Sequence, residues 1–296
     1  MEDHVQYAQQ AINAIQLGSI YALIALGYSM VYGVLTMINF AHGDLFMLGA
    51  FACLLIVALI PFHLPFVIVL LLVMVVIGLL GALIERLAYR PLRHAPRVSA
   101  IITALGCGLL IENTTLSFSP YARPMPQLFT STSYNFAGLT ISTLQILIIG
   151  IAVVLMVGLD LFIRRTKYGM AMRAISFDSR TVPLLGIPVN RVISITFFVG
   201  AALGGAAGML YGIAYPIVTA NMGVLIGWKA FVAAVIGGIG SVRGAVLGGF
   251  ILGSVEVLSV AFLPSTYRDL IAYSLLLVIL IFLPNGILGK PPLQKV

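Results

Sequence analysis

Hydrophobic residues are gathered into long blocks along the chain, and short polar segments separate the blocks. A block of roughly 18 or more apolar residues with few charges is typical of a helix that crosses a bilayer. Membrane barrel strands would instead alternate apolar and polar residues, and these blocks do not. The pattern predicts nine apolar helical segments, over residues 11–36, 39–60, 66–86, 98–118, 141–163, 192–213, 227–241, 244–263 and 268–288.

Composition supports the same interpretation, because 61% of the 296 residues are hydrophobic and only 8% are charged. Soluble domains are usually about a quarter charged. An open sheet could not satisfy its backbone groups in lipid, which favours helices. We therefore expect an all-α, polytopic membrane bundle of eight or nine transmembrane segments, some of them broken, forming a single domain over residues 1–296.

The net charge of +7 is concentrated in the segments 86–97 and 164–191 and at the C-terminal end. An excess of Lys and Arg marks cytoplasmic loops, so all three regions are expected in the cytoplasm. Nine crossings then place the N-terminus outside, together with the polar stretch 119–140, whose single charge is Arg123. No aromatic residues interleave with the basic ones as a stacking platform would require, so nucleic acid is not an expected partner.

The segment 227–241 is too short for an untilted helix of about 20 residues. If it did not cross, the basic C-terminus would lie outside, against the positive-inside pattern. We therefore expect it to belong to a crossing that is broken or extended by residues 214–226.

Glycines recur at intervals of four residues in two of the predicted helices. This spacing lets helix backbones approach closely, which matters where lipid removes the hydrophobic drive to associate. The contacts could lie within this chain or with a second membrane subunit, and spacing alone does not choose between them. The predicted packing residues are Gly200, Gly204, Gly208, Gly212, Gly244 and Gly248.

Polar residues interrupt the apolar pattern most densely between Asn39 and Asp44. Ionisable residues at membrane depth are costly and suggest function by default. The segment could be a broken-helix site that meets a polar solute, or a plain cytoplasmic turn. Asn39, His42 and Asp44 are therefore candidates for a substrate path. No further metal ligands stand at suitable spacing, so no metal site is expected.

Glu112 and Glu256 lie deep in the fourth and eighth predicted segments. Each could line a polar pathway or bond a neighbouring helix. Both are added to the substrate-path candidates.

The basic segment 164–191 also contains apolar residues, which suits either a protein contact or an amphipathic segment lying on the membrane. The chain contains no P-loop motif, nucleophile elbow, paired-His zinc motif or Gly-rich dinucleotide loop. We therefore expect no enzyme activity and no cofactor bound by this chain.

Several runs, weak individually, occur together in an order that resembles the branched-chain amino acid ABC transporter permeases of the LivH type. The resemblance covers essentially the whole chain. It is carried by Leu17–Leu23, Asn39–Asp44, Gly169, Arg173, Ala174, Leu185, Gly186, Ile187, Lys229–Phe231, Gly237–Ser241, Gly244–Ala245 and Gly248–Gly249.

The resemblance implies a permease half in a bacterial inner membrane that pairs with a second, homologous permease. Two cytoplasmic ATPase subunits would hydrolyse ATP, and a periplasmic binding protein would deliver the substrate. The ATPase-coupling residues would be Gly169, Arg173, Ala174, Leu185 and Gly186. Two positions depart from the family pattern: Val182 before Pro183, where a small Ala is common, and Val242–Arg243, where Pro is common.

The predicted function is thus the translocation subunit of an ATP-driven importer for aliphatic amino acids. Amide, urea, sugar or other amino acid cargo is the alternative within the same class. The intramembrane acids Asp44, Glu112 and Glu256 also allow an ion-coupled secondary transporter.

Overall fold

The structure, a computed structural model, describes residues 2–60, 64–93, 95–136, 138–178 and 181–289, most of them helical. Short 3-10 and π-helical turns extend or connect the α-helices. The helical elements are α1 (Glu2–Leu35), α2 (His42–Leu59), α3 (Phe66–Ile84), η1 (Glu85–Tyr89), η2 (Arg90–Leu92), α4 (Arg97–Phe118), α5 (Thr143–Arg165), α6 (Lys167–Phe177), η3 (Val182–Leu185), α7 (Val189–Ala214), α8 (Met222–Gly237), α9 (Val242–Phe262), η4 (Ser265–Tyr267) and α10 (Arg268–Phe282).

Within the described residues, eight helices are long and apolar enough to cross a bilayer, and α8 is a ninth, shorter apolar helix of 16 residues. This confirms the all-α, polytopic membrane fold. Some boundaries differ from those predicted: α1 begins at Glu2, well before residue 11, and α10 ends at Phe282 instead of 288. The early end of α10 follows from Pro284, because the residue before a proline disfavours the helical conformation.

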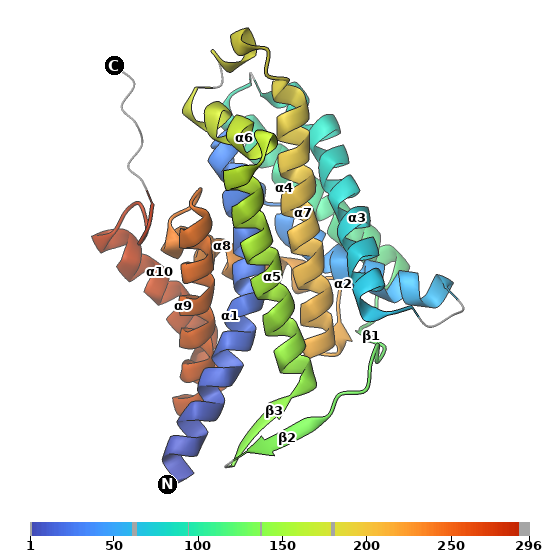
Figure 1. Cartoon of the computed structure of the whole chain (residues 1–296), viewed down its shortest axis with the longest axis vertical. Helices are drawn as coiled ribbons and strands as arrows, with labels where there is room; N and C mark the ends of the chain where they lie inside the picture. The colour runs from blue at the N-terminus through green and yellow to red at the C-terminus, as the bar shows by residue number, and fades with distance from the viewer. Residues whose placement is uncertain (1, 61–63, 94, 137, 179–180, 290–296) are drawn as a thin grey trace.

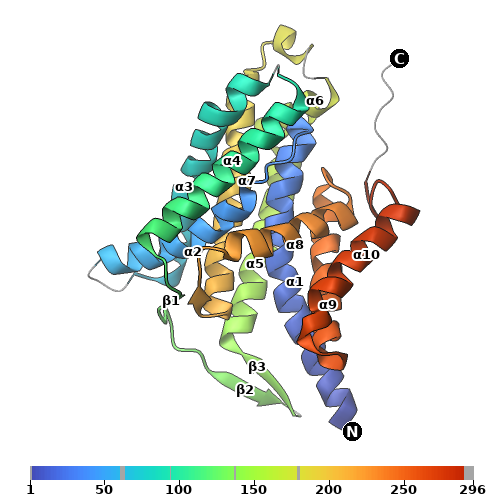
Figure 2. The ribbon, with the colours of Figure 1, turned by 180° about the vertical axis from the view of Figure 1, so that it is seen from behind.

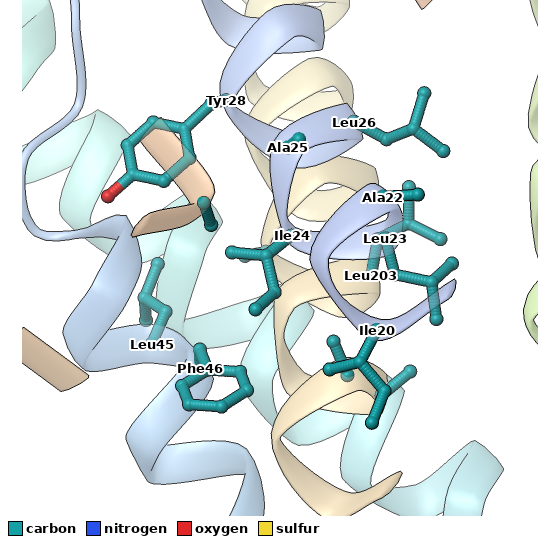
Figure 3. Packing of buried hydrophobic residues seen from close by; sticks show 14 of the residues in the cluster. Ile20, Ala22, Leu23, Ile24, Ala25, Leu26, Tyr28, Leu45, Phe46 and Leu203 are labelled. Carbon is teal, nitrogen blue, oxygen red and sulfur yellow. The ribbon is translucent and has the colours of Figure 1, made fainter. Parts of the chain in front are cut away.

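Helix α1 occupies the centre of the bundle and is buried along most of its length (Figure 1). It packs mainly on α9 and α7, and α7 in turn packs on α2 and α3. Figure 3 shows Ile24 of α1 facing Leu45 and Phe46 of α2 in this core. Helices α4 and α10 lie at the periphery and leave most of their side chains exposed (Figure 2).

The predicted packing glycines lie at contacts between segments, most of them close. A Cβ on Gly208 of α7 would collide with the carbonyl oxygen of Phe46 in α2. A Cβ on Gly200 would lie 3.3 Å from the carbonyl oxygen of Gly27 in α1. Such contacts let helices approach to backbone distance and replace the hydrophobic drive that lipid removes. The other four glycines each have a different neighbour: Gly204 approaches His42, Gly212 Met125, Gly244 Gly237 and Gly248 Ala233.

The two ends of the bundle differ in what they carry (Figure 1). One end holds the junction between α3 and α4, the helix α6 and residues 283–289, which pack on the end of α8 through hydrogen bonds to Ile236 and Gly237. The other holds the start of α1 and two short antiparallel ladders. These pair β1 (Arg123–Pro124) with β4 (Ile217–Val218), and β2 (Ser133–Phe136) with β3 (Leu139–Ser142). The basic residues predict that the first end is cytoplasmic.

Helices α2 and α8 both begin inside the bundle. A Cβ at Gly108, near the midpoint of α4, would lie 2.5 Å from Oδ2 of Asp44 in the first turn of α2. The start of α8 lies beside it, because a Cβ on Gly227 would lie 2.6 Å from the Cα of Gly43. Figure 2 shows α8 crossing in front of α1 at a steep angle to it. Helix α8, with 16 residues, therefore spans only part of the membrane. It is preceded in the chain by β4 and the residues around β4.

Candidate functional site

The polar segment at residues 39–44 lies within the bundle. Helix α1 ends at Leu35, and the chain turns at Thr36, whose φ of 54° is unusual for a residue other than glycine. The chain then runs back to His42, where α2 begins at the depth of the middle of α4. This geometry favours the broken-helix alternative, in which a helix start at membrane depth offers backbone groups to a solute.

Asn39 and His42 are held by neighbouring helices. Tyr89, at the end of η1, donates a hydrogen bond from Oη to Oδ1 of Asn39 at 2.8 Å. The imidazole of His42 lies against Gly27 of α1, and its ring centre is 4.6 Å from that of Tyr28. Both side chains are buried and position the start of α2, and neither lines the adjacent cavity.

Asp44 and Glu112 do line a common cavity, of about 80 Å³, which we call the Asp44 cavity. Asp44 is 5% exposed, and its Oδ1 has no hydrogen-bond partner among the described residues. Glu112 reaches the cavity from α4 and is half-buried. The remaining wall is apolar, aromatic or glycine: Tyr28, Phe40, Gly43, Leu105, Gly108, Leu109, Gly223, Val224, Gly227 and Trp228.

The Asp44 cavity is acidic and apolar at once. No Lys or Arg stands in its wall within the described part of the chain. Unpaired carboxylates at membrane depth are expensive, and a cationic group nearby would offset that cost. The leucines and aromatic rings of the wall suit an aliphatic group. At about 80 Å³ the cavity is smaller than a site that encloses a whole amino acid, so its wall can contact the ammonium group and aliphatic side chain of a solute that passes it.

Glu256 lies in a different cluster, away from the other path candidates. Its Oε1 accepts a hydrogen bond from Nζ of Lys229 in α8 at 2.8 Å, and its Oε2 accepts one from Oη of Tyr21 in α1 at 2.5 Å. Nε of Arg268 lies 3.1 Å from the same Oε1, and Nζ of Lys229 lies 2.7 Å from Asp269. The cluster joins α1, α8, α9 and α10, and its two cations balance its two carboxylates.

A second charged cluster ties α3 to α7 at the predicted cytoplasmic end. Glu85 is fully buried and forms ion pairs with Arg90, at 3.2 Å, and with Arg93. Oγ of Ser194 in α7 donates to Oε2 of Glu85 at 2.6 Å. Arg93 also reaches Asn190 of α7 at 2.6 Å. These contacts fix the base of α7, the helix that follows the basic segment 164–191.

The basic segment folds into α6 and the short turn η3. Thr166 caps α6 by accepting a hydrogen bond from the backbone N–H of Gly169 at 3.0 Å. A Cβ on Gly169 would collide with the carbonyl oxygen of Ile163, so glycine permits the sharp turn out of α5. Gly186 ends η3 with a φ of 74°, a conformation that glycine adopts without strain.

The outer face of this segment is apolar and uncovered. Leu184 and Leu185 are 84% and 73% exposed, and Met170 and Phe177 of α6 are also exposed. Arg173 of α6 is also exposed, and Ala174 is half-buried. We call these six residues the α6 surface. An exposed apolar patch beside charged residues is typical of a protein contact.

Sequence reasoning missed several residues that build the Asp44 cavity, among them Tyr28 and Trp228. Gly223 and Gly227 were also missed, although their four-residue spacing is the same small-xxx-small signal used for α7. Tyr28 and Trp228 could not have been found from the sequence, because an aromatic residue in an apolar helix is ordinarily a packing residue.

A helical membrane bundle with a polar cavity at a broken helix is typical of membrane transport proteins. The family model described as "Branched-chain amino acid transport system / permease component" matches residues 10–280. The chain therefore belongs to that family.

Similar proteins cover the whole chain. The high-affinity branched-chain amino acid transport system permease protein LivH of Salmonella typhimurium is 40% identical over 100% of this chain and 99% of its own length. The corresponding permease protein BraD of Pseudomonas aeruginosa is 41% identical over 100% of both chains. A probable branched-chain amino acid transport permease protein of Methanocaldococcus jannaschii is 30% identical over 93% of this chain and 90% of its own. No solved structure matches the chain.

Proposed function

We propose that this chain is the translocation subunit of an ATP-driven importer for branched-chain and other aliphatic amino acids. Family membership and full-length similarity to LivH and BraD support this proposal. The subunit works in the bacterial inner membrane beside a second, homologous permease and two cytoplasmic ATPases, which bind and hydrolyse the ATP. A periplasmic binding protein delivers the amino acid at the opposite end.

The observation that carries the substrate class is the Asp44 cavity. An aliphatic amino acid presents an ammonium group and a branched apolar side chain. The unpartnered Oδ1 of Asp44 and the carboxylate of Glu112 suit the first, and the wall around Leu105 and Leu109 suits the second. The solute passes from one end of the bundle to the other past the start of α2.

Uptake of radiolabelled L-leucine into proteoliposomes that hold the four-subunit complex, with binding protein outside and ATP inside, tests this role. Asp44→Asn should lower uptake by about ten-fold or more, the factor expected for loss of a charge-assisted hydrogen bond. Asp160→Asn is the matched control, because the Asp160 side chain is more than a third exposed and pairs only with Arg164 in the described residues. Unchanged uptake in the double variant Asp44→Asn, Glu112→Gln would contradict the assignment.

We propose further that the α6 surface docks on an ATPase subunit. Its exposed leucines and Arg173 offer an apolar contact rimmed by positive charge. Arg173→Glu should abolish the stimulation of ATP hydrolysis by loaded binding protein, while Arg191→Glu, exposed in the same basic segment, should leave it intact. Equal stimulation in both variants would argue against docking at Arg173.

Two rival functions give different results in the same proteoliposomes. An ion-coupled transporter would take up leucine without ATP and respond to a proton or sodium gradient. An importer for another solute would show ATP hydrolysis stimulated by binding protein loaded with an amide, urea or a sugar, and not by leucine. The proposed importer requires ATP and responds to the aliphatic amino acids.

A further inference from the structure

A second cavity, of about 370 Å³, lies between the first half of α1 and the second half of α9. Its size falls in the range of about 300–1,000 Å³ found for small-molecule sites. It lies toward the end of the bundle that carries the start of α1 and the β2–β3 ladder (Figure 1). We call it the amide-lined cavity, because Gln10, Asn13 and Gln16 of α1 share its wall.

The three amides lie along one side of α1, at spacings of three residues. Polar side chains within a membrane helix face protein or water and not lipid, because lipid offers them no hydrogen bonds. Gln145 of α5 donates a hydrogen bond from Nε2 to Oδ1 of Asn13 at 3.0 Å, which fixes that amide. Gln16 makes no side-chain hydrogen bond in the described part of the chain, so its amide is available to a ligand.

Arg268 supplies the cation of this cavity. Its Nε lies 3.1 Å from Oε1 of Glu256, and its two terminal nitrogens make no hydrogen bond among the described residues. The side chain is 47% exposed, in contrast to Glu256 at 3%. A guanidinium fixed at Nε and open at its terminal nitrogens is well suited to bind a carboxylate.

Besides the amides and Arg268, the wall contains two more polar side chains, the carboxylate of Glu256, which is paired with Arg268, and Tyr215; its other residues are apolar. Leu17 of α1, together with Val257 and Val260 of α9, faces the same space as the amides and Arg268. A ligand that fits must therefore combine a carboxylate, a hydrogen-bond donor for amide oxygens and an aliphatic group.

We propose that the amide-lined cavity is a receiving site for the zwitterion of an aliphatic α-amino acid, before the solute reaches the Asp44 cavity. Arg268 holds the carboxylate, and the amide oxygens of Gln10 and Gln16 accept hydrogen bonds from the ammonium group. The inference rests on the proposed function for the identity of the solute, and it adds a site that recognises the carboxylate.

Cysteine labelling tests occupancy directly. In a chain whose native cysteines are replaced (Cys53→Ala, Cys107→Ala), Gln16→Cys in the full complex should react with a membrane-impermeant maleimide added outside. L-Leucine should slow that reaction several-fold, and leucinamide, which lacks the carboxylate, should not. No labelling of Gln16→Cys, or equal protection by the two compounds, would overturn the proposal.

Transport kinetics test the guanidinium. Arg268→Lys keeps the charge and its ion pair with Glu256 but loses the two terminal guanidinium nitrogens that would bind the carboxylate. The KM for loaded binding protein in leucine uptake should therefore rise about ten-fold. Gln16→Leu touches no ion pair and should raise the same KM. It therefore tests the site even if the Arg268→Lys complex does not assemble. Arg123→Lys is the control, because Arg123 is exposed at the same end and outside the cavity.

The outcomes separate this inference from the proposed function. Wild-type leucine uptake with unaltered KM in both Arg268→Lys and Gln16→Leu would refute the receiving site and leave the importer standing. Absence of leucine uptake in the wild-type complex, with ATP hydrolysis stimulated by another solute, would refute the importer for leucine and with it the proposed ligand.

Discussion

Replacing Lys229 with methionine would remove one of the two cations that neutralise the buried carboxylate of Glu256. The side chains of Lys229 and Glu256 are 5% and 3% exposed, and Nζ lies 2.8 Å from Oε1. Removing one partner of a buried ion pair costs about 3–5 kcal/mol. Because Tyr21 and Arg268 would still contact Glu256, we expect the lower end of that range, about 3 kcal/mol.

Thermal unfolding of the purified chain in detergent measures this cost. The single tryptophan, Trp228, stands next to Lys229 and reports unfolding by its fluorescence. A loss of about 3 kcal/mol should lower the apparent melting temperature by roughly 5–10 °C. The double variant Lys229→Met, Glu256→Gln should lose less than the sum of its two single variants, because it removes both buried charges together.

Arg164→Met is the matched control. It breaks an ion pair with Asp160 in which both side chains are more than a third exposed, and such pairs contribute at most about 1 kcal/mol. Equal melting shifts for Lys229→Met and Arg164→Met would refute the reasoning. So would a double variant whose loss equals the sum of the single losses.

Three further changes test the close contact between α7 and α2, the turn from α5 into α6 and the ion pairs of Glu85. Gly208→Ala should lower the melting temperature by several degrees, because its Cβ meets a carbonyl oxygen of α2, whereas Gly158→Ala, with open space around it, should not. Gly169→Ala should displace α6 from the end of α5 and reduce ATP hydrolysis stimulated by loaded binding protein, and Gly158→Ala, which has open space around it, should leave that stimulation intact. Glu85→Gln leaves Arg90 and Arg93 without their carboxylate and should cost about 3 kcal/mol in the same melting assay; no shift would contradict a stabilising role for the Glu85 ion pairs.

The fold class could be predicted from the sequence because apolar blocks of membrane length have few other solutions. The block at 227–241 also corresponds to a short helix, although α8 begins at Met222 and ends at Gly237. Helix starts inside the bundle are harder to predict, since no local signal tells a turn at the membrane surface from one at its centre. The depth of His42 follows only from contacts of the start of α2 with other helices, among them α1, α4 and α7.

The candidate site was predicted in part, for the same reason. Asp44 and Glu112 share a cavity although 68 positions separate them, and nothing in their own surroundings in the sequence indicates this. Glu256 was grouped with them because it too is a carboxylate at membrane depth. Its partners Lys229 and Arg268 come from other helices, and pairing between helices depends on tertiary packing that periodicity does not encode.

Helix α8 connects the two cavities through one turn. Trp228 lines the Asp44 cavity, and the next residue, Lys229, pairs with Glu256 in the wall of the amide-lined cavity. Neighbouring residues of a helix point about 100° apart, so one turn faces both spaces. On the proposed path a solute passes this turn, and the ion pairs of Lys229 oppose its displacement. Lys229→Met releases that turn without altering the terminal nitrogens of Arg268, whereas Arg268→Lys alters the carboxylate site and leaves Lys229 paired. Melting temperature should therefore respond chiefly to the first change and the KM for uptake chiefly to the second.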